Sequence, residues 1–562
     1  MKPRLSFPIL FLLLSPLFVF SQKKAELKKI EAALRTHVSY LADDKLEGRR
    51  TGTAGEKLAM EYIANQFQAI GLEAKGTEKY YQPFSVSEGK EMKPGTVFSV
   101  TKTFSQGATA SKVLTLGTEY FAFPYSANGT IAGTATSGLQ EIGSPWLIDI
   151  ALVLEDNSSN PHFDLPGYIY EFSKNAKTKG ATAVLWYNSG KQDDKLSFNG
   201  KDRSPVLEIP VIYLTKKPLD GVSAEDEEGE LSFNATIQIG EKLRNGYNVV
   251  GYIDNKAATT VVLGAHFDHL GYGEDGNSRF EKKEPAIHNG ADDNASGTAT
   301  LIELARTLKK TKGAATNYLF IAFSGEELGL YGSKYFTDHP TIDLKSINYM
   351  INMDMVGRLS DSAKTITIGG YGTSPAWASL VNAQNNLRSA GNLQIKIDSS
   401  GSGPSDHTSF YRKDIPVLFY FTGLHTDYHK PSDDADRINY KGMVTILQHA
   451  KNVIEGANAQ GRLAFLKTRE AQTTTTARFS VSMGIMPDYT YSGNGVRADG
   501  VSEGKPAQKA GLKAGDVVLQ IGDYKVNSME SYMQTLGKFK KGDRATVVYQ
   551  RGTEQFKVEI QF

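Results

Sequence analysis

Metal-competent side chains stand directly after four apolar runs of this sequence. The runs 261–265, 318–323, 351–353 and 415–421 are followed respectively by His266 and Asp268, by Glu326 and Glu327, by Asp354, and by the loop with Tyr428 and His429. Open α/β sheets place their ligand sites at the carboxyl ends of the strands. Any single acid here could instead cap a helix or pair with an arginine. Because converging carboxylates repel one another unless a cation compensates them, the set as a whole indicates bound metal.

Two further acids, Asp292 and Asp293, stand at the mouth of a predicted helix over 295–309, whose apolar residues recur with helical spacing. From 247 to 456, apolar strands alternate with such amphipathic helices. This alternation predicts an α/β fold, a three-layer α/β/α sandwich with a mostly parallel central sheet.

Composition narrows the classes of function. The chain has 562 residues, which is more than one compact core usually contains, so several domains are expected. Lys and Arg number 63 and Asp and Glu 62, and this balance disfavours nucleic-acid binding. Cysteine is absent, so any metal must be held by His and carboxylate side chains, and a lipid anchor on cysteine is excluded.

The first residues, 1–21, combine a short basic start, an apolar run over 7–20 and a small Ser21. This pattern is typical of a secretory signal peptide. A membrane anchor is the alternative, but the run contains two prolines and is shorter than the ~20 apolar residues of a spanning helix. We expect a mature chain from near Gln22, periplasmic or extracellular, without stable membrane insertion.

The pattern of apolar and polar residues along the chain predicts an enzyme domain interrupted by an insert. Helical spacing up to Gly71 opens the first part, 22–110, and the main part covers 246–457. Between them, 111–245 is expected to be a separate β-rich domain. Its predicted strands are Ile150 to Leu154, Ala181 to Tyr187 and Ile209 to Leu214, and its predicted helix is Tyr168 to Lys179.

A linker over 458–477, with the polar run Thr473 to Thr476, is expected to precede a small β-rich module over 478–562. Two short helical patterns mark that module, near Pro506 to Lys513 and near Ser528 to Phe539.

Over about 25–110 and 246–456 the chain resembles the co-catalytic, two-zinc aminopeptidases of peptidase clan MH. Their His-x-Asp, Gly-Ala-Asp-Asp-Asn, Glu-Glu, Asn-Met-Asp and final Tyr-His elements all occur here in family order. The insert resembles a protease-associated domain. The tail resembles a bacterial PDZ domain, with Met483 to Pro487 at the place of a carboxylate-binding loop and Pro506 to Asp516 at its internal helix and turn; a purely stabilising module is the alternative.

The resemblance implies two Zn²⁺ per chain and assigns their ligands. His266 and Asp354 would hold one ion, Glu327 and His429 the other, and Asp292 would bridge them. It also implies a cis peptide bond between Asp292 and Asp293. His269, His288, His407 and His425 compete as ligands, and His425 is the main rival of His429. The segment Lys430 to Asp433 favours His429, because it matches the family's ligand segment, and Asp406 with His407 is expected near the metals or the substrate pocket.

Catalytic roles follow from the same resemblance. Glu326 is expected to be the general base that takes a proton from the attacking water. Asp268 is expected to accept the ring N–H of His266 and so to orient the imidazole. Tyr428 could donate to the oxyanion or simply pack beside His429.

These roles predict a metallo-exopeptidase that removes N-terminal residues from peptides. Its expected partners are peptide substrates and, in the PDZ groove, a peptide C-terminus. The alternatives are a same-fold carboxypeptidase, dipeptidase or glutaminyl cyclase, and a non-catalytic peptide-binding protein. Because a degenerate site would be expected to lose ligands or base, the complete set of residues disfavours a non-catalytic protein.

Overall fold

The computed structural model divides into two compact units, one formed by Met1–Phe84 with Asn245–Phe562 and the other by Ser85–Arg244. The second unit begins earlier than the expected residue 111, because strand β3 (Val97–Phe104) pairs along its length with β10 (Gly229–Ile237). The structure describes residues 15–562 apart from 105–106, 159, 161–162, 191–192, 201, 203, 216–228, 281–283, 312–313, 386–392, 469–480, 488–493, 502–503 and 528.

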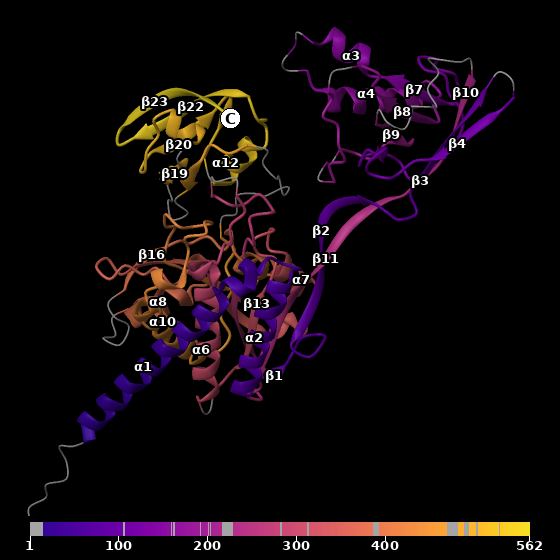
Figure 1. Cartoon of the computed structure of the whole chain (residues 1–562). Helices are drawn as coiled ribbons and strands as arrows, with labels where there is room; N and C mark the ends of the chain where they lie inside the picture. The colour runs from indigo at the N-terminus through magenta and orange to yellow at the C-terminus, as the bar shows by residue number, and fades with distance from the viewer. Residues whose placement is uncertain are drawn as a thin grey trace, which may run out of the picture. The chain divides into compact units, whose positions relative to one another are not determined.

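A nine-stranded mixed sheet forms the centre of the first unit (Figure 1). Four parallel strands occupy its middle in the order β13, β12, β14, β17: Asn317–Phe323, Thr260–His266, Ile347–Met353 and Val417–Phe421. The remaining strands extend its two edges: β1 (Glu73–Ala74), β2 (Tyr81–Met92) and β11 (Ile239–Ile253) on one side, β15 (Thr365–Gly369) and β16 (Gln394–Ile397) on the other.

Alternate side chains of the buried strands enter two different cores, as the pleat of a strand requires. In β13, Tyr318 and Phe320 pack into one apolar cluster, whereas Leu319 and Ile321 pack into another. Helices cover the first face at α1 (Ser15–Leu41), α2 (Ala54–Ile70), α6 (Gly297–Lys309), α8 (Ala376–Asn385) and α10 (Tyr440–Asn458), and the second at α7 (Tyr331–Asp338) and α9 (His407–Tyr411). The predicted α/β/α sandwich is therefore confirmed.

The unit Ser85–Arg244 contains two four-stranded sheets. One has the order β4 (Thr109–Val113), β3, β10, β6 (Gly129–Thr134), and the other β5 (Tyr120–Ala122), β9 (Val211–Leu214), β8 (Ala183–Tyr187), β7 (Pro145–Asp149). Helix α4 spans Leu165–Thr178. The resemblance of this unit to a protease-associated domain stays a prediction.

One predicted strand of the insert is wrong. Residues Ile150 to Leu154 do not form a strand, because β7 ends at Asp149 and helix α3 (Ala151–Asp156) begins two residues later. The Asp149 carboxylate accepts the backbone N–H of Ala151 at 2.9 Å, which stabilises the first turn of α3. The apolar run alone did not distinguish a short strand from a short helix.

The C-terminal part forms a six-stranded sheet with its own core. Its strands are β18 (Ile485–Pro487), β19 (Val496–Val501), β20 (Val517–Ile521), β21 (Tyr524–Lys525), β22 (Arg544–Arg551) and β23 (Glu554–Gln561), with helices α11 (Pro506–Lys509) and α12 (Met529–Leu536). The polar run 473–476 lies outside the described residues. The first part of the expected linker packs on the peptidase sandwich, where Leu466 donates its backbone N–H to Thr373 at 2.8 Å.

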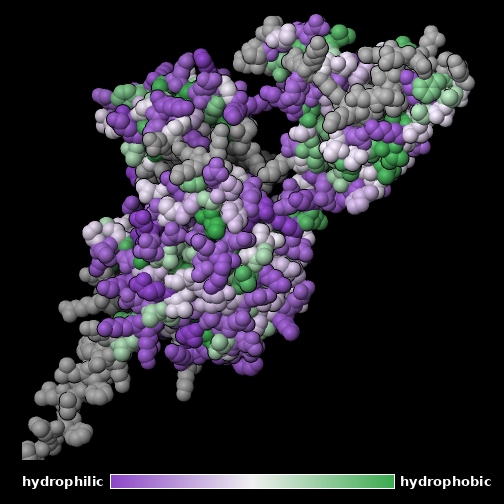
Figure 2. Space-filling model, in the orientation of Figure 1, coloured by the Kyte–Doolittle hydropathy of each residue, from purple (hydrophilic) through white to green (hydrophobic). Residues whose placement is uncertain are grey.

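The expected signal segment lies largely outside the described residues, since these begin at Ser15 within α1. Among the described residues, no helix has the length and apolarity needed to cross a membrane. The face drawn in Figure 2 is mostly hydrophilic, with small hydrophobic areas scattered over it.

Candidate metal centre

The parallel strands deliver the predicted ligands to one edge of the sheet. His266 is the last residue of β12, and Asp354 directly follows β14. Glu327 comes four residues after the end of β13, and His429 lies in the loop after β17. Because these strands run in parallel register, their carboxyl ends meet.

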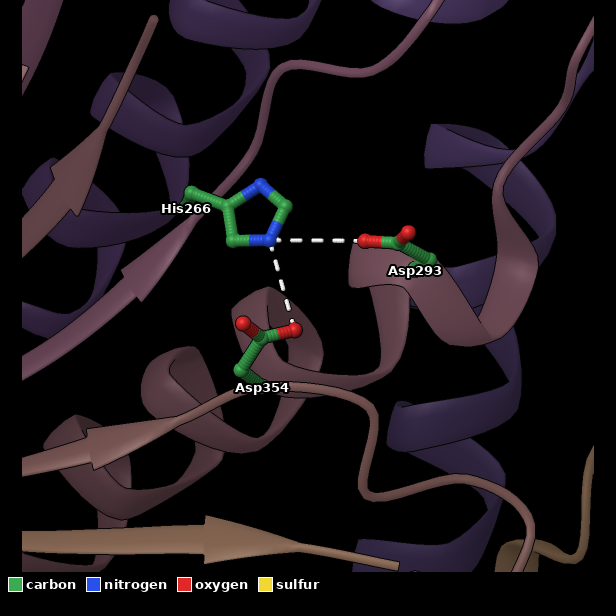
Figure 3. Close-up of side chains that lie close together, drawn as sticks. All are labelled: His266, Asp293 and Asp354. Carbon is green, nitrogen blue, oxygen red and sulfur yellow. Dashed lines mark hydrogen bonds and ion pairs between the residues drawn. The ribbon is translucent and has the colours of Figure 1, made fainter. Parts of the chain in front are cut away.

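The first group of ligand-competent atoms surrounds His266 Nε2. This nitrogen lies 3.3 Å from Asp354 Oδ1 and 3.4 Å from Asp293 Oδ1, as the dashed lines in Figure 3 show. The imidazole is almost completely buried. Its Nδ1 lies 3.2 Å from the backbone carbonyl oxygen of Asp268 and 3.7 Å from the Asp268 carboxylate, so the nearest acceptor is the carbonyl oxygen of Asp268 and not the carboxylate expected from the sequence.

The second group uses the other oxygen of Asp293. His429 Nε2 lies 3.3 Å from Asp293 Oδ2 and 3.3 Å from Glu327 Oε2. The Nδ1 of His429 donates to the carbonyl oxygen of Asn277 at 2.8 Å, a tautomer that leaves Nε2 free to bind a metal. His269 also reaches this group, with Nδ1 2.8 Å from Glu327 Oε1 and 3.9 Å from Asp293 Oδ2.

These separations fit donors arranged around two zinc ions. Two donors on one tetrahedral zinc lie about 1.63 bond lengths apart, which is roughly 3.3 Å for the usual bonds of about 2.0–2.1 Å. The four nitrogen–oxygen distances that join Asp293, Asp354 and Glu327 to His266 and His429 measure 3.3 to 3.4 Å. Good N–H···O hydrogen bonds are shorter, near 2.9 Å. A single ring N–H also cannot serve two carboxylates, whereas a cation can.

The expected bridging residue is wrong by one position. Asp292 turns to the opposite side of the segment, where its Oδ1 accepts the backbone N–H of Gly357 at 2.6 Å and the Ser296 hydroxyl at 3.0 Å. Its Oδ2 lies 3.2 Å from Nε2 of His425. The cis peptide bond joins Asp293 to Asn294 and not Asp292 to Asp293. Asp293 therefore occupies the place between the two histidines that was expected for Asp292.

Neighbouring side chains hold the loop that carries Asp293. The buried carboxylate of Asp433 accepts the backbone N–H groups of Asp292 at 2.8 Å and of Asp293 at 3.1 Å through one oxygen. Asp433 belongs to the same loop as His429, so the two sides of the centre are joined by these hydrogen bonds. The Ser405 hydroxyl similarly donates to Oδ2 of Asp354 at 2.7 Å.

The other histidines named from the sequence have separate environments. The Nε2 of His288 lies 2.7 Å from the Ser278 hydroxyl, and its Nδ1 lies 2.9 Å from the carbonyl oxygen of Ala286, so both ring nitrogens have hydrogen-bond partners. His407 is buried and stacks on Phe419, and burial lowers the pKa of its imidazole to about 3, as suits an uncharged packing group.

Two residues expected to act in catalysis stand at the centre. Withdrawal from solvent raises the pKa of Glu326 well above its usual value, and the charges of Asp354 and Glu327 act in the same direction while His266 opposes them. The Tyr428 ring stacks on the His429 ring, with centroids 3.9 Å apart, and the Arg279 guanidinium lies 4.7 Å from the Tyr428 ring centroid.

Comparison with known proteins places two families on the chain. Residues 248–454 match the model of Peptidase family M28, and residues 481–562 match the model of the PDZ domain. The curated protein "Aminopeptidase YwaD" of Bacillus subtilis is 25% identical over 425 residues, which cover 73% of this chain and 80% of that protein.

Solved structures of similar fold include BSAP, described as a zinc aminopeptidase from Bacillus subtilis, with a TM-score of 0.42, 22% identity and coverage of 77% of this chain and 95% of that one. Porphyromonas gingivalis glutaminyl cyclase has a TM-score of 0.40, 12% identity and coverage of 76% and 98%. The chain is thus identified as a metallopeptidase that carries a Peptidase family M28 domain over residues 248–454 and a PDZ domain over residues 481–562.

Proposed function

We propose that this chain is a two-zinc aminopeptidase that removes residues from the N-termini of peptides. The observation that carries the proposal is the pair of histidines, His266 and His429, placed at zinc-like ligand separations from the two oxygens of one carboxylate, Asp293. The name of the curated Bacillus subtilis relative supports the choice of aminopeptidase over other peptidases.

In this proposal His266 and Asp354 would hold one ion, Glu327 and His429 the other, and Asp293 would contribute one oxygen to each. His269 donates to the Glu327 carboxylate and orients it rather than binding metal, because its 2.8 Å contact is a normal hydrogen bond. Zinc, when bound, supplies a water of lowered pKa and polarises the scissile carbonyl.

Glu326 accepts the proton of the attacking water and returns it to the departing amine. Burial is the main cause of its raised pKa, and the neighbouring carboxylates of Asp354 and Glu327 raise that pKa further. Asp268 limits rotation of the His266 ring from the far side. Tyr428, whose ring contacts His429 and Arg279, would donate its hydroxyl to the developing oxyanion.

Metal analysis and a matched set of peptides test the proposal. Purified protein is expected to contain two zinc ions per chain and to release the first residue of a peptide with a free amino group. N-terminal acetylation of the same peptide should abolish cleavage. Glu326→Gln should keep both ions and lose about 10²–10⁴-fold in kcat, the usual contribution of a general base. Full activity of that variant would refute the assigned role.

The competing activities give different products from the same assays. A carboxypeptidase would cleave the acetylated peptide, a dipeptidase would accept dipeptides alone, and a glutaminyl cyclase would release ammonia from a peptide with N-terminal Gln. We propose further that the segment 1–21 directs export and that the PDZ domain binds a peptide C-terminus. Secretion of a reporter fused to residues 1–21 tests the first of these.

A further inference from the structure

A segment far upstream of the M28 match reaches the metal centre. Thr51 lies at the start of the turn before α2, and its side chain is buried. The Thr51 hydroxyl donates to Oδ2 of Asp268 at 3.0 Å, a contact between residues 217 positions apart. The matched residues begin only at 248, so nothing in that match assigns a role to Thr51.

The carboxylate that accepts the Thr51 hydrogen bond lies beside two functional residues. Through Oδ1, Asp268 accepts the backbone N–H of Glu326 at 3.2 Å. The same oxygen lies 3.7 Å from Nδ1 of His266. A rotation of the Asp268 carboxylate would therefore break its hydrogen bond to the backbone of the proposed base and shift a negative charge beside the ring of a proposed zinc ligand, and the Thr51 hydrogen bond opposes that rotation.

Buried polar groups surround the Thr51 hydroxyl. The Ser324 hydroxyl lies 3.3 Å from Thr51 Oγ1 and donates to Oε1 of Glu56 at 2.5 Å. Glu56 also accepts the backbone N–H groups of Gly52 at 2.6 Å and Tyr247 at 3.1 Å. The chain of contacts ties the N-terminus of α2 to the loop that carries Glu326.

Arg49 fixes the backbone of the segment against the same loops. Its buried guanidinium donates to the carbonyl oxygens of Phe267 at 2.7 Å, Asn289 at 2.6 Å and Gly290 at 3.0 Å. These carbonyls adjoin His266 on one side and the Asp293 loop on the other. Arg49 adopts a left-handed backbone, with φ of 49°, a conformation that a non-glycine residue keeps only where its surroundings impose it.

From these contacts we propose that Thr51 is a positioning residue for the reaction, acting through Asp268 on His266 and Glu326. The inference rests on the proposed function. The part of Thr51 that matters is its hydroxyl, since its methyl group serves packing: a Cβ added at Gly246 would meet Thr51 Cγ2 at 2.7 Å.

Two substitutions separate the hydroxyl from the methyl group. Thr51→Val keeps the shape and the methyl contact but removes the donor to Asp268. Thr51→Ser keeps the donor but removes the methyl group. Loss of partners that orient metal ligands typically costs 10–100-fold in metal affinity or activity. Because Thr51 acts through an intermediate carboxylate, we expect the low end for Thr51→Val, about tenfold in kcat with KM within about twofold.

The readouts are kcat and KM, zinc retained per chain against increasing chelator, and the melting temperature of the metal-free full-length protein. We expect Thr51→Val to release zinc at about tenfold lower chelator concentration and Thr51→Ser to stay within about threefold of wild type in both assays. If the residue serves packing alone, Thr51→Ser will be the more damaged variant, or both will shift only the melting temperature, and the inference is overturned.

The wild type and Glu326→Gln, measured alongside, keep the two hypotheses apart. A wild type that binds zinc and cleaves the free peptide, with Thr51→Val unchanged, overturns the role of Thr51 alone. A wild type that neither binds zinc nor cleaves the peptide overturns the proposed function and the role of Thr51 with it.

Discussion

Replacing Asp292 or Asp293 by asparagine, in two separate variants, gives the sharpest test of the metal centre. Asp293→Asn replaces a carboxylate that faces both histidines by a neutral amide of the same shape. Asp292→Asn makes the same chemical change one residue earlier, where the side chain contacts Ser296, Gly357 and His425. The pair is matched in chemistry and differs only in direction.

The expected cost for Asp293→Asn follows from charge. Two unit charges about 4 Å apart in an effective dielectric of about 20 interact by about 4 kcal/mol, which corresponds to roughly a thousandfold in affinity. Each zinc ion carries two charges, so this figure is a lower bound for each ion. In Asp292→Asn the oxygen toward Gly357 is retained and the new amide can face a neutral His425, so zinc affinity should stay within about tenfold of wild type.

The zinc affinity of both variants is measured as the zinc retained per chain after dialysis against increasing concentrations of chelator. This measurement does not depend on catalysis. Asp293→Asn should lose both ions at chelator concentrations that leave Asp292→Asn fully loaded. The melting temperature of each metal-free protein controls for general damage to the fold. Retention of two ions by Asp293→Asn, or their selective loss from Asp292→Asn, would refute the assignment of the bridge.

Two further predictions concern stability and domain structure. Burial lowers the pKa of His449 to about 4, so the unfolded chain binds this proton at a higher pH than the folded one, and the free energy of unfolding should fall by about 2 kcal/mol between pH 7 and pH 5. Urea unfolding of metal-free His449→Gln at these pH values should lack that part of the pH dependence, and an unchanged dependence would contradict the prediction. Replacing Ser85–Arg244 by an Asn-Gly turn should leave a folded peptidase unit with two zinc ions per chain, because β2 pairs with β11 and Gly246 lies against the Phe84 ring. Loss of zinc together with loss of the melting transition would contradict this prediction.

The sequence predicted much of the sheet and most of the candidate ligands, because both follow from apolar runs and from the polar residues that come just after them. His266 and Asp354 directly follow strands whose apolar runs are unmistakable, and parallel strands must bring their ends together. The error at Asp292 has a local cause. The backbone at Asp293 and Asn294 departs from helical geometry, so helical spacing could not decide which of two neighbouring carboxylates faces the histidines.

The roles of Arg49 and Thr51 depend instead on contacts across more than two hundred positions of sequence. Both residues precede the insert, and the loops of the metal centre that they contact follow it. The run Gly48 to Glu56, rich in glycine, threonine and charge, has the composition of an ordinary surface turn. Only the folded sandwich shows that Arg49, Thr51 and Glu56 are buried.

The insert thus separates two segments of sequence, up to Phe84 and from Asn245 on, that pack together in the sandwich. This order of segments affects how the chain can fold during synthesis. The residues up to Phe84 leave the ribosome long before β12 exists, so their apolar helix faces have no sheet to cover during that interval. Joining the ends of a long unstructured loop costs entropy that grows with its length. An insert that folds first, with strands β2 and β11 paired, would bring those ends together in advance and reduce that cost for the late assembly of the enzyme.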